Sequence, residues 1–321
     1  MIATAPGKLI VTGEYAVLDG APALVIAVNR RVVASRRTGP RGSSPFLVAL
    51  ADEIAKRHGA DHPAARAALE IVVDSKAFYL GTQKLGLGSS AAVTVAATAL
   101  ALAADHQAVP VIDQHEIADI ATAAHAAAQG ARGARGSGAD IAAAVYGGVI
   151  AYERALPHTR LSWPSNLTLI PFFTGVSADT PALVAAVQAA RDRDRSGVEA
   201  ALAAIDRASR AACQACAVRT PEIAGNALLA ALSLAAHATD QLAAVTRLML
   251  VPSCVAAART AMARLGGTAK TTGAGGGDIG IAVMPSTEDA TEARRYLIEA
   301  GCQPLPLAVD TTGVDLQPDA Q

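Results

Sequence analysis

The sequence predicts an α+β fold made of two domains. Strand-like segments rich in Val, Ile and Ala dominate the first half, whereas the second half is mostly helical before strands return near its end. A chain of 321 residues is longer than a domain with a single hydrophobic core usually is, which favours two domains. Residues 155–166 hold two prolines and the single Trp, which predicts a boundary between domains of residues 1–160 and 161–312. Residues 313–321 then form a tail.

Hydrophobic periodicity and turn residues place the elements of each domain. In the first domain we expect strands over residues 2–11 and 22–36, a helix over 45–58, a strand over 69–73, helices over 89–104, 113–129 and 139–146, and a strand over 149–152. In the second we expect a strand over 167–173, three helices within 180–237, a helix over 252–265, a strand over 279–284, a helix over 287–300 and a closing strand over 304–309. The polar residues from 313 onward are expected to be frayed.

Composition narrows the classes of function. A net charge of −1 and an aromatic content of 3% argue against a nucleic-acid partner, and the charge also argues against an anionic membrane surface. The apolar helices 91–104 and 224–236 are too short or too interrupted to span a bilayer, and no secretory leader is expected. Cys213 and Cys216 have C-x-x-C spacing, but no second pair completes a metal site. We therefore expect a cytoplasmic protein, and the sequence is compatible with a homodimer.

Residues 84–97 have the pattern of a phosphate-binding loop that opens a helix. Gly86 and Gly88 allow a tight turn that brings backbone N–H groups close to a ligand, and two serines supply hydroxyls at the helix start. The helix N-terminus adds partial positive charge, although an ordinary turn with an N-cap has the same pattern. Further glycine-rich motifs favour phosphate binding, so the expected nucleotide-binding residues are Lys84, Gly86, Leu87, Gly88, Ser89, Ser90 and Ala91.

Three motifs in a fixed order carry a resemblance to a known family. They are Pro6-Gly7-Lys8 and the residues that follow to position 17, the loop at 86–92, and the glycine-rich segment 270–280. They match neither a Walker A loop nor a dinucleotide-binding turn. In this order and spacing, over nearly the whole chain, they resemble the GHMP kinases, which include galactokinase, homoserine kinase, mevalonate kinase and phosphomevalonate kinase. The resemblance implies a two-domain fold with the active site in the cleft between the domains, and ATP and Mg²⁺ as cofactors.

The resemblance also implies roles for individual residues. Residues 136–148 match the segment in which a GHMP kinase Asp faces the acceptor hydroxyl, which makes Asp140 the expected base and Lys8 the expected stabiliser of the transition state. Asp140 also stands where an acidic side chain favours a helix start, which is a structural alternative. Ser90 is the expected Mg²⁺ contact. The expected substrate contacts are Glu14, Tyr15, Ser137, Gly138, Ser177, Thr180, Gly273, Ala274 and Gly275, the last three from a run that offers unhindered backbone N–H groups.

Within the family, Tyr15 and residues 84–96 and 173–184 resemble the phosphomevalonate kinases, since mevalonate kinases carry His at the position of Tyr15. The resemblance implies transfer of the ATP γ-phosphoryl group to 5-phosphomevalonate. Joining two polyanions requires cations, and Lys8, Lys84 and the arginines of residues 132–135 are available. The helix ending at residue 130 lacks the Glu that mevalonate kinases add to the metal site, so the second metal contact stays open, as does the role of Asp179. The alternatives are a mevalonate kinase or a relative acting on another small acid, and a nucleotide-binding sensor without catalysis.

Overall fold

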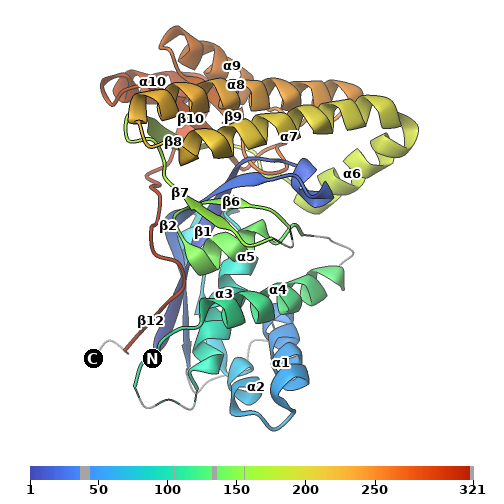
Figure 1. Ribbon diagram of the computed structural model, residues 1–321, viewed down its shortest axis with the longest axis vertical. Helices are drawn as coiled ribbons and strands as arrows, with labels where there is room; N and C mark the ends of the chain where they lie inside the picture. Colours follow the sequence, from blue (N-terminus) through green and yellow to red (C-terminus); the bar gives the residue numbers. More distant parts are fainter. Residues whose placement is uncertain (37–43, 105, 107, 132–135, 155, 319–321) are drawn as a thin grey trace.

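The computed structural model describes residues 1–36, 44–104, 106, 108–131, 136–154 and 156–318. Two antiparallel sheets organise these residues (Figure 1). The first has the strand order β12-β1-β2-β6-β7, with β3 also paired to β2; its strands are β1 (Ile2–Thr12), β2 (Ala23–Arg36), β3 (Ile71–Asp74), β6 (Val149–Tyr152), β7 (Thr159–Leu161) and β12 (Asp315–Gln317). The second has the order β11-β8-β10-β9, from β8 (Thr168–Phe173), β9 (Thr268–Thr271), β10 (Ile279–Met284) and β11 (Gln303–Pro304). Helices packed on antiparallel sheets confirm the expected α+β class.

The N-terminal helices gather below the first sheet in the view of Figure 1. They are α1 (Pro45–His58), α2 (Pro63–Ala68), α3 (Ser89–Leu102), α4 (Gln114–Gly130) and α5 (Ala139–Tyr146), with short 3-10 turns η1 (Ala16–Asp19) and η2 (Lys76–Phe78) and a small hairpin of β4 (Tyr79–Leu80) and β5 (Gln83–Lys84). Helices α3 and α5 pack directly on β1 and β2. Their buried faces consist largely of alanine, which lets a helix approach a sheet closely. This packing brings the start of both helices beside β1.

The second half of the chain adds α6 (Thr180–Arg193), α7 (Arg195–Ala217), α8 (Pro221–Thr246), α9 (Ser253–Arg264) and α10 (Glu288–Glu299). Helices α7 and α8 lie side by side across the molecule (Figure 1). Helix α7 contacts β1 and β2, whereas α8 contacts β9 of the second sheet. The helix pair therefore connects the two sheets through a continuous hydrophobic core.

Helix α8 is longer than the sequence predicts. At 26 residues, with a mean hydropathy of 1.3 over its most apolar window, it is long and apolar enough to cross a membrane. Burial within the protein gives a different reason for that composition, since Leu228, Ala231, Leu232 and Ala235 of α8 are buried. A core helix of a globular protein has the same apolar character.

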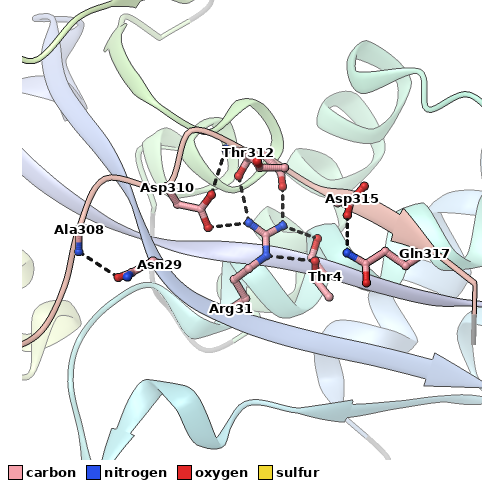
Figure 2. Close-up of polar contacts among 9 residues, drawn as sticks. Thr4, Asn29, Arg31, Ala308, Asp310, Thr312, Asp315 and Gln317 are labelled. Carbon is pink, nitrogen blue, oxygen red and sulfur yellow. Dashed lines mark hydrogen bonds and ion pairs between the residues drawn. The ribbon is translucent and has the colours of Figure 1, made fainter. Parts of the chain in front are cut away.

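The C-terminal segment differs from the expectation of a frayed tail. Figure 2 shows Arg31 of β2 at the centre of the contacts that hold the C-terminal segment. The Arg31 guanidinium donates to Asp310 Oδ2 at 2.6 Å, to the carbonyl of Thr312 at 3.0 Å and to that of Gly313 at 2.6 Å. Residues 315–317 then pair with β1 as strand β12. The prediction was wrong because these contacts join residues about 280 positions apart, which no local pattern records.

Short elements account for most other differences. Helix α2, the β4–β5 hairpin, β7 and β9 were not predicted, because two to six residues are too few to show a period. The expected strand at 304–309 reaches only to Pro304, and beyond it Val309 forms an isolated bridge with Val28. Strand β7 lies inside the predicted boundary segment and pairs with β6, while residue 155 lies outside the described residues. The division into domains at residue 160 stays a prediction.

Candidate active site

The loop between β5 and α3 presents a row of backbone donors. Leu85 and Leu87 are fully buried and fix the loop to the core, whereas the intervening Gly86 and Gly88 have φ values of 68° and 75°, in the left-handed region that favours glycine. Among the described residues, no acceptor receives a hydrogen bond from the backbone N–H groups of residues 86–91, and the first intrahelical bond runs from Ala92 to the carbonyl of Gly88. Unpaired N–H groups in a loop that leads into a helix N-terminus suit the binding of an anion, as expected of this loop.

Lys8 and Asp140 meet at Gly88. A Cβ placed on Gly88 would lie 3.0 Å from Lys8 Cε and 3.5 Å from Asp140 Cβ, so both side chains flank the same glycine. The backbone N–H of Lys8 donates to the carbonyl of Leu87 at 2.9 Å, which joins β1 to the loop. Burial lowers the pKa of Lys8, while Asp140 and Asp278 oppose that shift by stabilising the ammonium. The two residues expected to be catalytic therefore lie beside Gly88 in the expected phosphate loop.

Asp140 fits the structural and the catalytic interpretation together. It lies in the first turn of α5, and its Oδ1 accepts a hydrogen bond from the N–H of Ile141 at 3.1 Å. Its Oδ2 has no hydrogen-bond partner within the described part of the chain, although Asp140 attracts Lys8. One carboxylate oxygen thus supports the helix start, and the other is available to the site.

Asp278 is a member of this cluster that the sequence did not single out. Its carboxylate lies against the phosphate loop, since a Cβ on Gly86 would come within 2.3 Å of Asp278 Oδ2. Lys8 and Lys84 both attract it, but burial is the larger effect and raises the pKa of Asp278. Asp278 also has a φ of 51°, which is unusual for a residue with a side chain. The sequence did contain a signal for Asp278, an acidic residue directly after a glycine run. A carboxylate next to an expected phosphate site is electrostatically unfavourable, so its presence there indicates a role.

Ser90 is oriented from behind by His125. Ser90 Oγ lies 3.1 Å from His125 Nε2, and the amide nitrogen of Gln129 lies 3.5 Å from the same ring nitrogen. Burial lowers the pKa of His125, so the ring is neutral at neutral pH. A neutral imidazole carries its proton on one ring nitrogen, so in the tautomer protonated at Nδ1 the Ser90 hydroxyl donates to Nε2.

This arrangement suits Mg²⁺ at Ser90. When Ser90 donates its proton to His125, the hydroxyl oxygen keeps its lone pairs for a cation. Mg²⁺ prefers oxygen ligands from few protein groups together with phosphates. Within the described ranges, no group of three or more His, Cys, Asp or Glu side chains is placed to hold a metal ion. The residues present therefore fit a magnesium ion that arrives with a nucleotide.

Glu14, which the sequence predicts to contact a substrate, lies in the protein interior and pairs with Lys270. It is 2% exposed and forms a buried ion pair with Lys270 Nζ, which also donates to the carbonyls of Val11 at 2.8 Å and Thr271 at 2.6 Å. Burial raises the pKa of Glu14, and the Lys270 ammonium opposes that rise. The Glu–Lys pair therefore fixes motif 1 to motif 3 inside the protein, and both side chains are structural.

The glycine-rich run 273–277 also differs from its expected role. The N–H of Gly273 donates to Ile10, that of Gly275 to Thr272 and that of Gly276 to Leu250. These donors hold the loop and are not available to phosphates, which corrects the expectation for Gly273 and Gly275. The carbonyl of Ala274 is likewise used, because it accepts the Tyr15 hydroxyl at 2.6 Å.

Tyr15 has a structural position as well. Its side chain is 7% exposed, its φ is 57°, and burial raises the pKa of its hydroxyl. The bond to Ala274 joins motif 1 to motif 3 a second time, after the Glu–Lys pair. Tyr15 therefore shapes the surroundings of the site, and its hydroxyl already has a partner within the protein.

The remaining expected substrate residues lie on two loops. Ser137 accepts the N–H of Ala139 at 3.2 Å, and its carbonyl accepts the Tyr152 hydroxyl at 2.7 Å, while Gly138 caps α5 with a φ of 91°. Ser177 and Thr180 are exposed. Asp179, whose role was open, caps α6 by accepting the N–H of Ala182 at 3.1 Å. The arginines at 132 and 135 lie outside the described residues.

Several known proteins are similar to this chain in sequence or in fold. Residues 45–148 match the family model described as GHMP kinases N terminal domain. A phosphomevalonate kinase of Streptomyces sp. is 28% identical, and the match spans 97% of each chain. Two archaeal relatives match 56% of this chain: a phosphomevalonate kinase of Saccharolobus solfataricus at 31% identity, over 59% of its length, and a mevalonate kinase of Aeropyrum pernix at 29%, over 58%.

A solved structure of similar fold is that of Streptococcus pneumoniae phosphomevalonate kinase in complex with phosphomevalonate and AMPPNP. Its TM-score is 0.77 at 17% identity, and the match covers 96% of this chain and 99% of that one. At this identity the likeness establishes the fold alone. Together with the ordered motifs, the family model over residues 45–148 and the full-length relative, it shows that the chain is similar to the GHMP kinases, and these similarities support a phosphotransferase.

Proposed function

We propose that this protein is a cytoplasmic, ATP-dependent phosphomevalonate kinase, which transfers the γ-phosphoryl group of ATP to 5-phosphomevalonate and so forms 5-diphosphomevalonate and ADP in isoprenoid synthesis. The observation that carries the proposal is the meeting of Lys8, Asp140 and the unpaired N–H row 86–91 at Gly88. The full-length match to the Streptomyces enzyme supports the choice of substrate.

The phosphate loop would bind the nucleotide. Its free N–H groups and the α3 N-terminus would hold the phosphate oxygens of ATP, with Lys84 adding charge at the entrance. Ser90 would contact Mg²⁺, which supplies neutralisation of the phosphate charge when it is bound. Because the donors are fixed before the ligand arrives, no reorganisation is needed at the moment of transfer.

The chemistry of the acceptor determines which roles Lys8 and Asp140 would have in the transfer. A phosphate monoester has a second pKa of about 6, so 5-phosphomevalonate is largely ionised at neutral pH. The attacking oxygen then needs little deprotonation, and the larger barrier is repulsion between two polyanions. Lys8 would neutralise the charge that develops between acceptor and γ-phosphoryl group, while Asp140 would position Lys8 across Gly88.

A direct comparison of acceptors tests the proposal. ADP release should be measured by a coupled assay with 5-phosphomevalonate and with mevalonate under the same conditions. We expect kcat/KM to be at least about a hundredfold higher for 5-phosphomevalonate, equivalent to about 2.7 kcal/mol of discrimination. A preference for mevalonate would instead favour the mevalonate kinase alternative, which the Aeropyrum relative supports. Nucleotide binding without turnover of either acceptor would favour the sensor.

A further inference from the structure

Asp278 places a negative charge where the proposed ligand is also negative. Its Oδ2 is the atom that a Cβ on Gly86 would meet at 2.3 Å, so the carboxylate lies directly on the phosphate loop. Its neighbours include the two lysines that the proposed reaction uses, Lys8 on β1 and Lys84 on β5. The other described acidic side chain at this loop, Asp140, borders Gly88 through its Cβ, at 3.5 Å from a Cβ placed on that glycine.

The protein holds this carboxylate in place from several directions. The backbone N–H of Asp278 donates to Val176 at 2.7 Å, and its carbonyl accepts the N–H of Thr174 at 2.9 Å. Its Oδ1 accepts the N–H of Ala178 at 3.2 Å. The backbone of Asp278 is held at a φ of 51°. This conformation is unfavourable for a residue that has a Cβ, whereas glycine adopts it without a penalty. A strained conformation that the surrounding contacts maintain points to a function for the side chain.

A fixed carboxylate beside a phosphate loop affects free and metal-bound nucleotide differently. Uncomplexed ATP carries about four negative charges at neutral pH, and Mg²⁺ removes two of them, so the repulsion from Asp278 falls with the net charge of the ligand. Asp278 also competes with the phosphates for Lys8 and Lys84, because it already neutralises part of their charge. Both effects penalise the more highly charged ligand.

We propose that Asp278 is a specificity-determining residue that makes the phosphate loop selective for the magnesium complex of ATP over metal-free ATP. The selectivity arises from repulsion by a fixed charge and does not require Asp278 to contact the metal. The inference rests on the proposed binding of ATP phosphates by residues 86–91.

The test compares two ligands and three proteins by isothermal titration calorimetry, with no acceptor present. The ligands are ATP with EDTA and ATP with excess MgCl₂. Asp278→Asn keeps the acceptor for Ala178 but removes the charge, and Asp278→Gly removes the side chain while suiting the positive φ, so it is expected to fold. Asp74→Asn is the matched control, since exposed Asp74 also accepts one backbone N–H, from Lys76 at 2.9 Å, and also lies near a lysine.

We expect both Asp278 variants to bind metal-free ATP at least threefold more tightly than wild type, with a change of less than twofold for the magnesium complex. Asp74→Asn should match wild type with both ligands. Unchanged or weaker binding of metal-free ATP by the Asp278 variants would overturn the inference, and so would weaker binding of the magnesium complex alone, the result expected of a metal ligand. Absence of ATP binding by the wild-type protein would instead overturn the proposed function.

Discussion

Replacement of Gly88 by alanine tests whether the phosphate loop and Lys8 work as one unit. The added Cβ would lie 3.0 Å from Lys8 Cε and 3.2 Å from Lys8 Cγ, whereas carbon atoms pack at about 3.5–4.0 Å. Lys8 must therefore move by several tenths of an ångström or more. Displacement of a catalytic group by about 1 Å costs about a hundredfold in rate, so we expect kcat to fall by about ten- to a hundredfold. The left-handed φ adds about 1–2 kcal/mol of lost stability.

Gly81→Ala separates the contact with Lys8 from the backbone effect. Gly81 has a φ of 60°, close to that of Gly88, but a Cβ there meets nothing within 4 Å. Both variants should lose a similar amount of stability, seen as similar decreases in Tm, and only Gly88→Ala should lose kcat in the coupled ADP assay. The reasoning fails if the two variants have equal kcat, or if Gly88→Ala keeps the wild-type rate.

Two further predictions concern the lysines. Lys8→Met should lower the single-turnover rate by about 10²–10³, as for loss of one preorganised electrostatic donor, and Asp140→Asn should cost less; near-abolition in Asp140→Asn beside a mild loss in Lys8→Met would contradict the phosphate-acceptor argument. Lys270→Met should destabilise the protein by about 3–5 kcal/mol in urea unfolding, because it leaves buried Glu14 without its partner, and Lys270→Met combined with Glu14→Leu should recover most of that loss. A double variant no more stable than the single one would show that the ion pair is not the cause.

The sequence was sufficient to predict the glycine turn and the helix start at residues 86–91, because their conformation is decided locally. Two glycines two positions apart permit the left-handed φ values of the turn, and the serines and alanine-rich segment that follow favour a helix start, with little help from the rest of the chain. The roles of Lys8 and Asp140 were predicted from the family resemblance, and the position of both side chains beside Gly88 agrees with a shared site. The helices were predicted where apolar residues repeat over several turns.

Motif 3 shows why other residues were not predictable. A glycine run offers N–H groups, but the sequence does not record whether Ile10 or Leu250 already accepts them. Likewise, Lys270 has the same motif context as Lys8, yet a β-strand buries it against Glu14, a residue 256 positions away. The distinction between a catalytic and a structural lysine therefore depends on tertiary contacts that bring motif 1 and motif 3 together.

The charges around the loop explain why these structural contacts matter to the chemistry. Among the described groups at Gly86 and Gly88, the ammonium groups of Lys8 and Lys84 face the carboxylates of Asp140 and Asp278, so these side chains contribute no net charge. Two bound polyanions would therefore gain little from these four side chains alone. The N–H row of residues 86–91 at the α3 N-terminus and a cation bound with the nucleotide would supply further attraction. A site whose side-chain charges cancel would bind the magnesium complex of ATP together with the acceptor more favourably than it would bind metal-free ATP. The same cancellation of charge gives a reason for a carboxylate at position 278.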